Sequence, residues 1–311
     1  IYDAGPGVPN GFLTAAEIAT LERFYQGDPH RLARLRAIYC DVTGGSPFDP
    51  EDLLAMLEQC SPGETYAISM AQREGREIAW PVQHQRGLLE VWGWPDEQDI
   101  GIVVADPSSG VRDPEKSDAQ QPRNPAGLVL GSLRSRALLA RFNGYVNAHE
   151  LGMMARGLCN RCKRWVLVHE VNGGWGETFL RSFRDSPQGS TGNFWYERDP
   201  ITGKYATDPG WNQTHSRRGE LLAALQRALD EGGLRIPSRA AIENLMQVRI
   251  NENERWDQGD GRGPHGEDVI TLGILCAVME RGVAGVKAGS SVKLASAATR
   301  AGPNGIPAAP W

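Results

Sequence analysis

The chain lacks any hydrophobic run that approaches the roughly 18 residues of a membrane-spanning helix. No signal-peptide pattern opens the sequence, so we expect no membrane partner. The chain also lacks the basic excess of proteins that coat nucleic acid, because its net charge is −5. That deficit still allows an enzyme that contacts DNA over a small footprint. Carboxylates gathered around metal ions would themselves make the net charge more negative.

Cysteines are few and irregularly spaced, at positions Cys40, Cys60, Cys159, Cys162 and Cys276. An odd number without regular spacing is typical of a reducing compartment rather than of a disulfide scaffold. Cys159 and Cys162 have CxxC spacing, but no second pair lies close by in the sequence. A four-ligand zinc site would therefore need distant residues. The alternative is that both are small residues near the end of a helix.

The composition favours one large domain with flanking segments, because apolar residues make up 40% of the 311 positions. Residues 284–311 are rich in Ala, Gly, Ser and Pro and contain basic residues but no acid. This composition predicts a flexible basic tail. We expect residues 1–86 to hold linker helices and an irregular segment, and residues 87–283 to form the folded domain.

The spacing of apolar residues predicts a helix over residues 14–38 and a short helix that begins after Phe48. Residues 61–86 alternate weakly and predict irregular structure or short edge strands. The apolar run from Ile100 to Asp106 is typical of a strand buried on both faces. Further strands are predicted at 88–92, 126–133, 137–146, 165–171, 194–196 and 234–236. Further helices are predicted at 149–162, 214–231 and 265–281, with one ending at Phe183 and one capped by Ser238. This order predicts an α/β sheet with helices on its faces.

Three carboxylates stand out by their places in these elements. Asp106 ends the first buried strand, and Glu170 lies near the end of the otherwise apolar strand at 165–171. Asp268 lies in the first turn of the closing helix, which is apolar on nearly every side. Sites in open α/β sheets form outside the carboxyl ends of the strands. If the two strands are neighbours, Asp106 and Glu170 share an edge of the sheet, and the closing helix brings Asp268 to it.

Three acids in one apolar site repel one another unless something compensates their charge. Divalent cations do so, and sites made only of oxygen ligands suit hard ions such as Mg²⁺ or Mn²⁺. Two such ions about 3.5–4 Å apart activate water and stabilise the leaving oxygen in phosphodiester cleavage. The constellation therefore predicts a metal-dependent nuclease.

Each of these residues also has a plainer interpretation. An Asp at a strand end is often a turn former or a helix cap, which applies to Asp106. Glu170 needs a partner in an apolar strand, and an arginine serves as well as a metal ion. Asp268 is favourable at the positive end of its helix whatever its chemistry. His265 is explained equally well as a neutral capping or packing residue.

Four stretches occur in a particular order and spacing: Leu88–Pro95 followed by Ile100–Gly110, then Val168–Asn172, Gly210–Arg217 and His265–Asp268. Together they resemble the motifs of the nuclease domain of the large terminase subunit of tailed bacteriophages. The resemblance covers about Gly87 to Val283 and is carried by the combination rather than by any single motif.

The resemblance implies a ribonuclease H-like fold, with a mixed central sheet and helices on both faces. It implies that two Mg²⁺ or Mn²⁺ ions cut double-stranded concatemeric viral DNA during genome packaging. Asp106, Glu170 and Asp268 take the catalytic and metal-ligand roles. The family often has two Asp residues where this chain has Glu267 and Asp268, and we favour Asp268 as the ligand. Outer residues around the metal are then Glu267, His265, Asn172 and Asp118, the last on a loop that is longer than usual.

Large terminases also carry an ATPase motor with a GxxxxGK[ST] phosphate loop, and this sequence has no such motif. Because the sequence starts at Ile1 rather than Met, we expect it to be the carboxyl-terminal part of a terminase. The expected partners are double-stranded DNA, the motor domain of the same polypeptide, the portal and the small terminase subunit. The expected location is the host cell cytoplasm rather than the mature virion.

Binding of DNA needs cations near the carboxylates. The candidates are Arg134, Arg136, Arg141, Arg161, Lys163, Arg164, Arg217 and Arg218. Each is equally well explained as solvated surface. Two other functions fit a ribonuclease H-like fold: another nuclease, such as a junction resolvase or transposase core, or a non-catalytic module that docks to DNA or the portal.

Overall fold

The computed structural model describes residues 46–73, 75–108, 125–171, 174–185, 193–198, 202–212, 215–250, 256–257 and 267–281. Several predictions on the remaining residues lie outside this description. They concern the helix at 14–38, the tail at 284–311, Cys40, Asp118, Asn172 and His265.

The centre of the molecule is a seven-stranded mixed sheet with the strand order β2-β1-β3-β6-β5-β4-β7. Its strands are β1 (Glu64–Arg73), β2 (Arg76–Gln83), β3 (Leu89–Val91), β4 (Gly101–Asp106), β5 (Ala126–Ser132), β6 (Ala137–Gly144) and β7 (Trp165–His169). Strands β4, β5 and β6 form an antiparallel meander, and β7 pairs with β4 in parallel. This topology is that of a ribonuclease H-like α/β fold, which confirms the predicted fold class.

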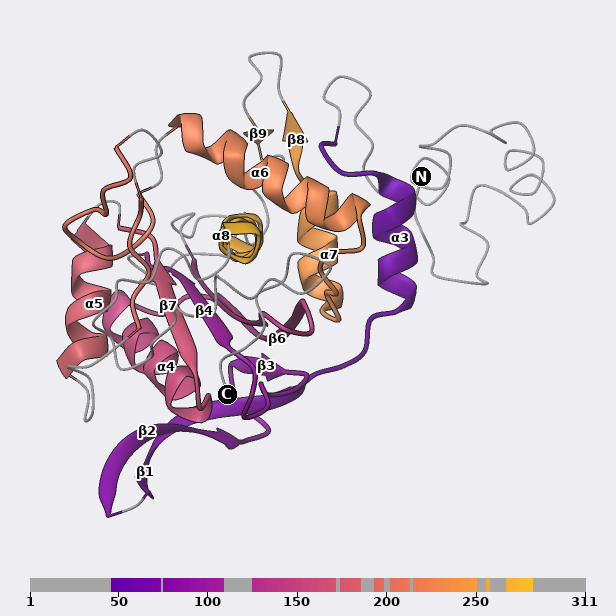
Figure 1. Cartoon of the computed structure of the whole chain (residues 1–311). Coiled ribbons are helices and arrows are strands. Elements are labelled where there is room, and N and C mark those ends of the chain that lie inside the picture. The colour runs from indigo at the N-terminus through magenta and orange to yellow at the C-terminus, as the bar shows by residue number, and fades with distance from the viewer. Residues whose placement is uncertain are drawn as a thin grey trace, which may run out of the picture.

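Helices cover both faces of the sheet. One face carries α8 (Glu267–Arg281) with α6 (His215–Asp230), α7 (Arg239–Met246) and α3 (Pro50–Glu58), and the other carries α4 (Ala148–Arg161) and α5 (Trp175–Asp185). Figure 1 shows α8 enclosed between the sheet and α6. A separate two-stranded ribbon pairs β8 (Arg249–Ile250) with β9 (Trp256–Asp257).

Strand β4 contributes to both cores, as its continuous apolar run predicts. Ile102 and Val104 belong to the core on the α8 side, whereas Val103 and Ala105 belong to the core on the α4 side. All six residues of the strand are buried. The alternation follows from the pleat, which turns successive side chains to opposite faces.

Two glycines let α8 lie close to its neighbours. A Cβ atom on Gly131 of β5 would lie 2.6 Å from a methyl carbon of Leu275, and one on Gly273 would lie 2.9 Å from the Cβ of Leu221 in α6. These distances are shorter than side-chain carbons tolerate in a close-packed interior. The close approach buries α8 from Asp268 to Met279 apart from the half-buried Ile270, which confirms the predicted buried helix.

The segment at 61–86 differs from the prediction of irregular structure or short edge strands. It forms a long antiparallel hairpin of ten and eight residues, β1 and β2, which continues the sheet beyond β3. Met70 and Val82 are 43% exposed, because α4 covers only part of the hairpin. Partial cover explains why the sequence alternates only weakly there.

The described part of the predicted linker, residues 46–86, packs with the rest of the molecule. Leu53 and Leu54 of α3 belong to the same core as α8, and α3 contacts α7. Among the described residues, no helix is long and apolar enough to cross a bilayer.

Candidate functional site

Asp106 and Glu170 lie side by side at one edge of the sheet. Ala105 of β4 pairs with His169 of β7 in parallel register, and the Glu170 N–H donates to the Ala105 carbonyl at 2.9 Å. Val104 and Val168, two residues earlier, both face the α8 core. Asp106 and Glu170 therefore also face the α8 side. The two strands are neighbours, which is the condition under which the sequence places Asp106 and Glu170 at one edge.

The Gly210–Trp211 segment supports the backbone at Glu170. The Trp211 N–H donates to the His169 carbonyl at 2.7 Å, and the Val171 N–H donates to the Trp211 carbonyl at 3.1 Å. Gly210 has φ +120°, and a Cβ atom there would lie 2.8 Å from the His169 carbonyl oxygen. Only glycine suits that conformation and that space. The Gly-Trp motif thus forms isolated β-bridges, one of them to Glu170, which fix the backbone there.

Helix α5 begins against the same backbone. A Cβ atom on Gly176 would lie 2.6 Å from the Glu170 carbonyl oxygen. The absence of a side chain at Gly176 therefore lets the first turn of α5 approach the backbone of Glu170 closely. The glycine that permits this contact, Gly176, is visible in the sequence shortly after Glu170.

Asp268 lies at the same edge and on the same face, but above β6. It is 1% exposed. Arg141 grips its carboxylate in a bidentate pair, with both N–O distances at 2.7 Å. The side-chain amides of Asn143 and Asn244 also donate to its Oδ2, at 2.9 Å and 2.5 Å. Asp268 therefore lies at the predicted edge, with three donors on its Oδ2 and one on its Oδ1.

Arg141 is therefore part of the interior rather than of a DNA-binding surface, which corrects its place among the candidate cations. Burial disfavours its charged form, but the hydrogen bonds and charge of Asp268 outweigh burial, and the pKa of Arg141 lies above its ordinary value. Glu90 of β3 adds a second acidic contact at 3.5 Å. The sequence raised an arginine as a possible partner for Glu170, and the structure shows such a partner for Asp268.

The oxygen atoms at this edge fit a hard divalent cation. Among the described residues, no three His, Cys, Asp or Glu side chains form a group that could hold a metal ion. Amide oxygens are not among these four residue types. The Oδ1 of Asn143 is buried without a hydrogen-bond partner. Asp106 and Glu170 lie on adjoining strand ends at the same edge. Two carboxylates and an orphaned amide oxygen are ligands that Mg²⁺ and Mn²⁺ accept. The side chain of Glu267 lies outside the described part.

Four helices begin at this edge. Helix α4 follows β6 through a capping box between Asn147 and Glu150, and α5 follows β7. Helix α6 follows Trp211, and α8 begins beside Asp268. Each helix N-terminus carries about half a positive charge. Together they offset the acids and favour phosphate groups at this edge.

Five of the predicted cations lie at the opposite edge, which corrects the expectation that they surround the carboxylates. Gly101, the first residue of β4, pairs with Ser132 and with Trp165. The residues that follow Ser132 and precede Trp165 are therefore about 17 Å from Asp106, given the rise of a strand. They are Arg134, Arg136, Arg161, Lys163 and Arg164.

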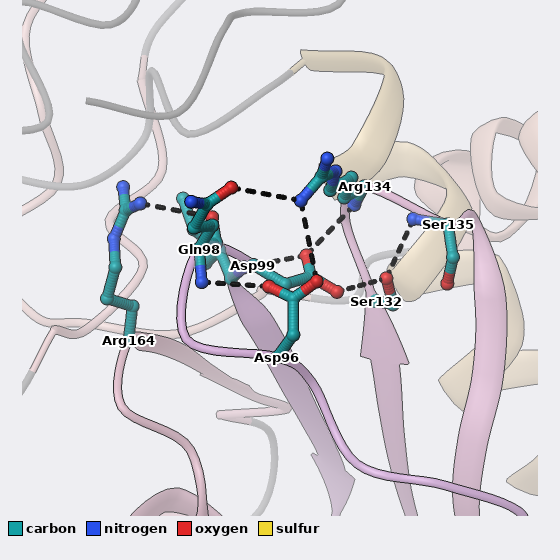
Figure 2. A network of polar contacts seen from close by, with 8 residues as sticks. Asp96, Gln98, Asp99, Ser132, Arg134, Ser135 and Arg164 are labelled. Atoms are coloured by element: carbon teal, nitrogen blue, oxygen red, sulfur yellow. Dashed lines mark hydrogen bonds and ion pairs between the residues drawn. The ribbon is translucent and has the colours of Figure 1, made fainter. Parts of the chain in front are cut away.

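These five residues have local partners there. Arg134 contacts Asp96 at 3.4 Å, and Lys163 contacts Glu97 at 2.8 Å. The Arg164 guanidinium donates to the carbonyl of Gln98 (Figure 2). Arg161 lies over the rings of Trp80 and Trp94, and Arg136 donates to the Gly233 carbonyl at 2.6 Å.

Among the candidate cations, Arg217 lies near Glu170. It stands at the start of α6, donates to the Asn212 carbonyl and pairs with Glu197. Trp211, next to Asn212, pairs with Glu170. Arg217 is thus the cation best placed to meet a phosphate at the carboxylate edge.

Within the described residues, the CxxC pair fits the second of its two interpretations, two small residues near the end of a helix. Cys159 and Cys162 are buried at the end of α4. The Cys162 thiol donates to the Leu158 carbonyl, and burial raises its pKa to about 12. Within the described part of the chain, no group of three or more His, Cys, Asp or Glu side chains that could hold a metal ion surrounds them.

No protein-family model matches this chain, and no curated protein matches it significantly. Solved structures that resemble it include the large terminase nuclease from thermophilic phage G20c with bound magnesium. That likeness has 12% identity and a TM-score of 0.45, covering 72% of this chain and 96% of the other. The large terminase nuclease domain of Thermus phage P74-26 is 13% identical with a TM-score of 0.44, covering 76% and 99%. The G20c nuclease was also solved with cobalt and with zinc. At these identities and TM-scores, the similarity to these structures supports no conclusion about chemistry. The chemistry of the site is inferred from the residues of this chain.

Proposed function

We propose that the chain is a divalent-metal-dependent endonuclease that cuts double-stranded DNA, as the nuclease part of a viral large terminase. The proposal rests on the register of β4 against β7, in which Asp106 and Glu170 follow the paired residues Ala105 and His169. Two carboxylates on adjoining parallel strand ends repel unless a cation lies between them. Two Mg²⁺ or Mn²⁺ ions, when bound, supply the Lewis acid and the activated water for phosphodiester hydrolysis.

The remaining residues at this edge have separate tasks. Asp106 and Glu170 hold the ions through their carboxylate oxygens, and the N-termini of four helices attract the phosphate backbone. Arg217 exchanges Glu197 for a phosphate when DNA binds. Asp268, predicted as the third ligand, faces the same edge with its carboxylate bound to Arg141. Glu267, His265, Asn172 and Asp118 remain predictions for the outer residues.

The packaging context is the finer part of the proposal and is motivated by the four sequence motifs. The substrate is then concatemeric viral DNA in the host cell cytoplasm. The partners are an ATPase motor domain of the same polypeptide, the portal and the small terminase subunit.

The test is cleavage of supercoiled plasmid in the presence of Mn²⁺ or Mg²⁺. We expect nicking and then linearisation, and a loss of at least roughly 10³-fold in rate for Asp106→Asn and for Glu170→Gln, because each removes a ligand charge. The control is Glu97→Gln, which makes the same change in charge at an exposed carboxylate paired with Lys163. It should cut like the wild type.

Three results would contradict the proposal. If Asp106→Asn and Glu170→Gln both cut at the wild-type rate, the site lies elsewhere. If the wild type cuts four-way junctions far faster than linear duplex, it is a junction-resolving enzyme of the same fold. DNA binding without any cleavage in Mn²⁺ would assign a docking module.

A further inference from the structure

The carboxylate of Asp268 is held by four protein donors, three of them on Oδ2 and one on Oδ1. A carboxylate offers about four lone-pair directions. Arg141 uses one direction on each oxygen, and the amides of Asn143 and Asn244 both donate to Oδ2. The group is 1% exposed and carries a bidentate arginine, which is the strongest pairing a carboxylate makes in a protein. The Oδ2 atom is therefore fully occupied, and a metal ion at Asp268 would have only Oδ1 to bind, on the side that Arg141 leaves open.

Asn143 presents the opposite case, a buried oxygen atom without a partner. Its Nδ2 donates to Asp268 at 2.9 Å, and because a carboxylate only accepts, the amide nitrogen must face Asp268. The orientation of the amide is therefore set, and Oδ1 points elsewhere. That oxygen is buried and has no hydrogen-bond partner. Buried acceptors are nearly always satisfied, so this one calls for a ligand.

The register puts Asn143 in line with Asp106. Asp106 pairs with Gly127 of β5, and Gly127 pairs with Asn143 of β6. Directly paired residues share a face of the sheet, and the residue between them has no side chain. Two strand spacings separate the backbones by about 9–10 Å. Two ions about 3.5–4 Å apart, with bonds of about 2.1 Å, span about 8 Å between their outer ligands, so a row of this width suits such a pair.

We propose that Asn143 Oδ1 is a metal ligand at this edge, on the side of Asp106 away from Glu170. Asp268 is then a positioning residue that holds the Asn143 amide, and Arg141 and Asn244 hold Asp268. This inference rests on the proposed function, because the ion concerned is the one that cleavage requires. It changes the role of the third predicted acid from ligand to support.

The test measures Mn²⁺ binding directly, by calorimetry or by the electron paramagnetic resonance of free Mn²⁺, without DNA. We expect Asn143→Ala to weaken Mn²⁺ binding at least about tenfold. The matched control is Asn244→Ala, which removes another amide donor to the same oxygen of Asp268 but no orphaned acceptor. It should weaken binding less than about threefold. Asp268→Asn should weaken binding less than Asn143→Ala does, because an amide oxygen can still accept from Arg141.

Folding of each variant is checked by circular dichroism and by the shift in Tm that Mn²⁺ produces. If Asn143→Ala does not fold, Asn143→Ser, which keeps a hydroxyl donor but no carbonyl, takes its place with the same expected loss. Wild-type affinity in Asn143→Ala, together with a loss in Asp268→Asn as large as in Asp106→Asn, overturns the inference and makes Asp268 the ligand. Equal losses in Asn143→Ala and Asn244→Ala also overturn it, since both would then act only through Asp268.

Failure of this inference is distinguishable from failure of the proposed function. A wild type that cuts plasmid with Mn²⁺ while Asn143→Ala binds Mn²⁺ normally refutes only the role of Asn143. A wild type that neither binds Mn²⁺ nor cuts refutes both.

Discussion

The two ends of strand β4 each carry a buried aspartate, Asp99 just before the strand and Asp106 at its last residue. They are 5% and 8% exposed. Asp99 accepts from the N–H groups of Ile100 and Arg134 and from the hydroxyl of Ser132, so it ties β4 to the turn after β5 (Figure 2). Asp106 instead adjoins a second acid, Glu170, on a parallel strand. A buried acid thus does not by itself indicate a functional site. A second acid at the end of the neighbouring strand does indicate one.

The two ends differ in charge as well. The end with Asp99 carries five of the predicted basic residues, each with local partners. The end with Asp106 carries the N-termini of four helices and Arg217. A DNA-cutting edge whose attraction for phosphate comes largely from helix termini needs few basic side chains. This arrangement is compatible with the net charge of −5.

Exchanging the same side chain at both ends gives the largest expected effects. Asp106→Asn should lower the cleavage rate at least roughly 10³-fold, about 4 kcal/mol in the barrier, with little change in stability. Asp99→Asn should lower the free energy of unfolding by about 2–4 kcal/mol, because an amide N–H would then face other donors. Its cleavage rate per folded molecule should stay that of the wild type. Urea unfolding and plasmid cleavage, measured on the same samples, check both.

The distinction between the two ends of β4 would be wrong if Asp106→Asn and Asp99→Asn had the same effects on cleavage and stability. A loss of cleavage in folded Asp99→Asn would mean that the far end takes part in catalysis or in DNA binding. A loss of stability in Asp106→Asn equal to that in Asp99→Asn would mean that Asp106 is another structural carboxylate.

The pair of Arg141 and Asp268 should show the next largest effect. Arg141→Met leaves the Asp268 charge buried with only two amide donors and should cost about 3–5 kcal/mol of unfolding free energy. Adding Asp268→Leu should restore most of that loss, because two apolar side chains of similar size then replace the ion pair. Urea unfolding of the single and double variants measures the coupling. If Arg141→Met left the free energy of unfolding unchanged, the ion pair between Arg141 and Asp268 would not be formed in solution.

Much of the carboxylate edge was predictable from the sequence because its signals are local. The apolar run before Asp106 and the one before Glu170 each predict a buried strand. Burial alone does not set the direction of pairing, because the equally buried β5 pairs with β4 antiparallel. Asp268 was predictable as a member of the edge, because its helix is apolar all round and had to cover the sheet. The glycines at 176 and 210 were visible, but their close contacts with the Glu170 backbone depend on tertiary packing.

The partner of Asp268 was not predictable, because Arg141 and Asn143 precede it by 127 and 125 residues and meet it only through the register of β6. The place of the basic residues, by contrast, was within reach of the sequence. In an antiparallel pair, the turn after the second strand lies at the opposite end from the last residue of the first. Arg134 and Arg136 therefore had to lie far from Asp106 once β4 and β5 were paired.

The thiol of Cys162 reports, through a smaller expected effect on stability, how well the Asp99 end of the sheet is shielded from solvent. A Cβ atom on Gly101 would lie 2.8 Å from its sulfur, and burial, with a further contribution from the Asp99 charge, raises its pKa to about 12. The folded pKa lies above the ordinary 9.0 of a thiol, so the unfolded chain loses this proton first as pH rises. The stabilising contribution is complete below pH 9 and falls by about 1.4 kcal/mol per pH unit towards 12.

Comparison with Cys162→Ala isolates that contribution. The difference in unfolding free energy between wild type and variant should be constant below pH 9 and should shift against the wild type above it. The native thiol should also resist alkylation at pH 8, unlike the partly exposed Cys60. A parallel pH dependence of the two proteins, or rapid alkylation of Cys162, would show that this end of the sheet is open.

The smallest expected effects concern the exposed cations, and they decide which end meets DNA. Arg134→Ala and Lys163→Ala should each change stability by less than about 1 kcal/mol, because their ion pairs are exposed. They should also leave the dependence of DNA affinity on salt unchanged, because they lie at the Asp99 end. Arg217→Ala should reduce the slope of log affinity against log salt by about 1, the signature of one lost phosphate contact. If Arg134→Ala and Lys163→Ala flatten the slope and Arg217→Ala does not, DNA lies along the Asp99 end and the carboxylate edge is not where the duplex is cut.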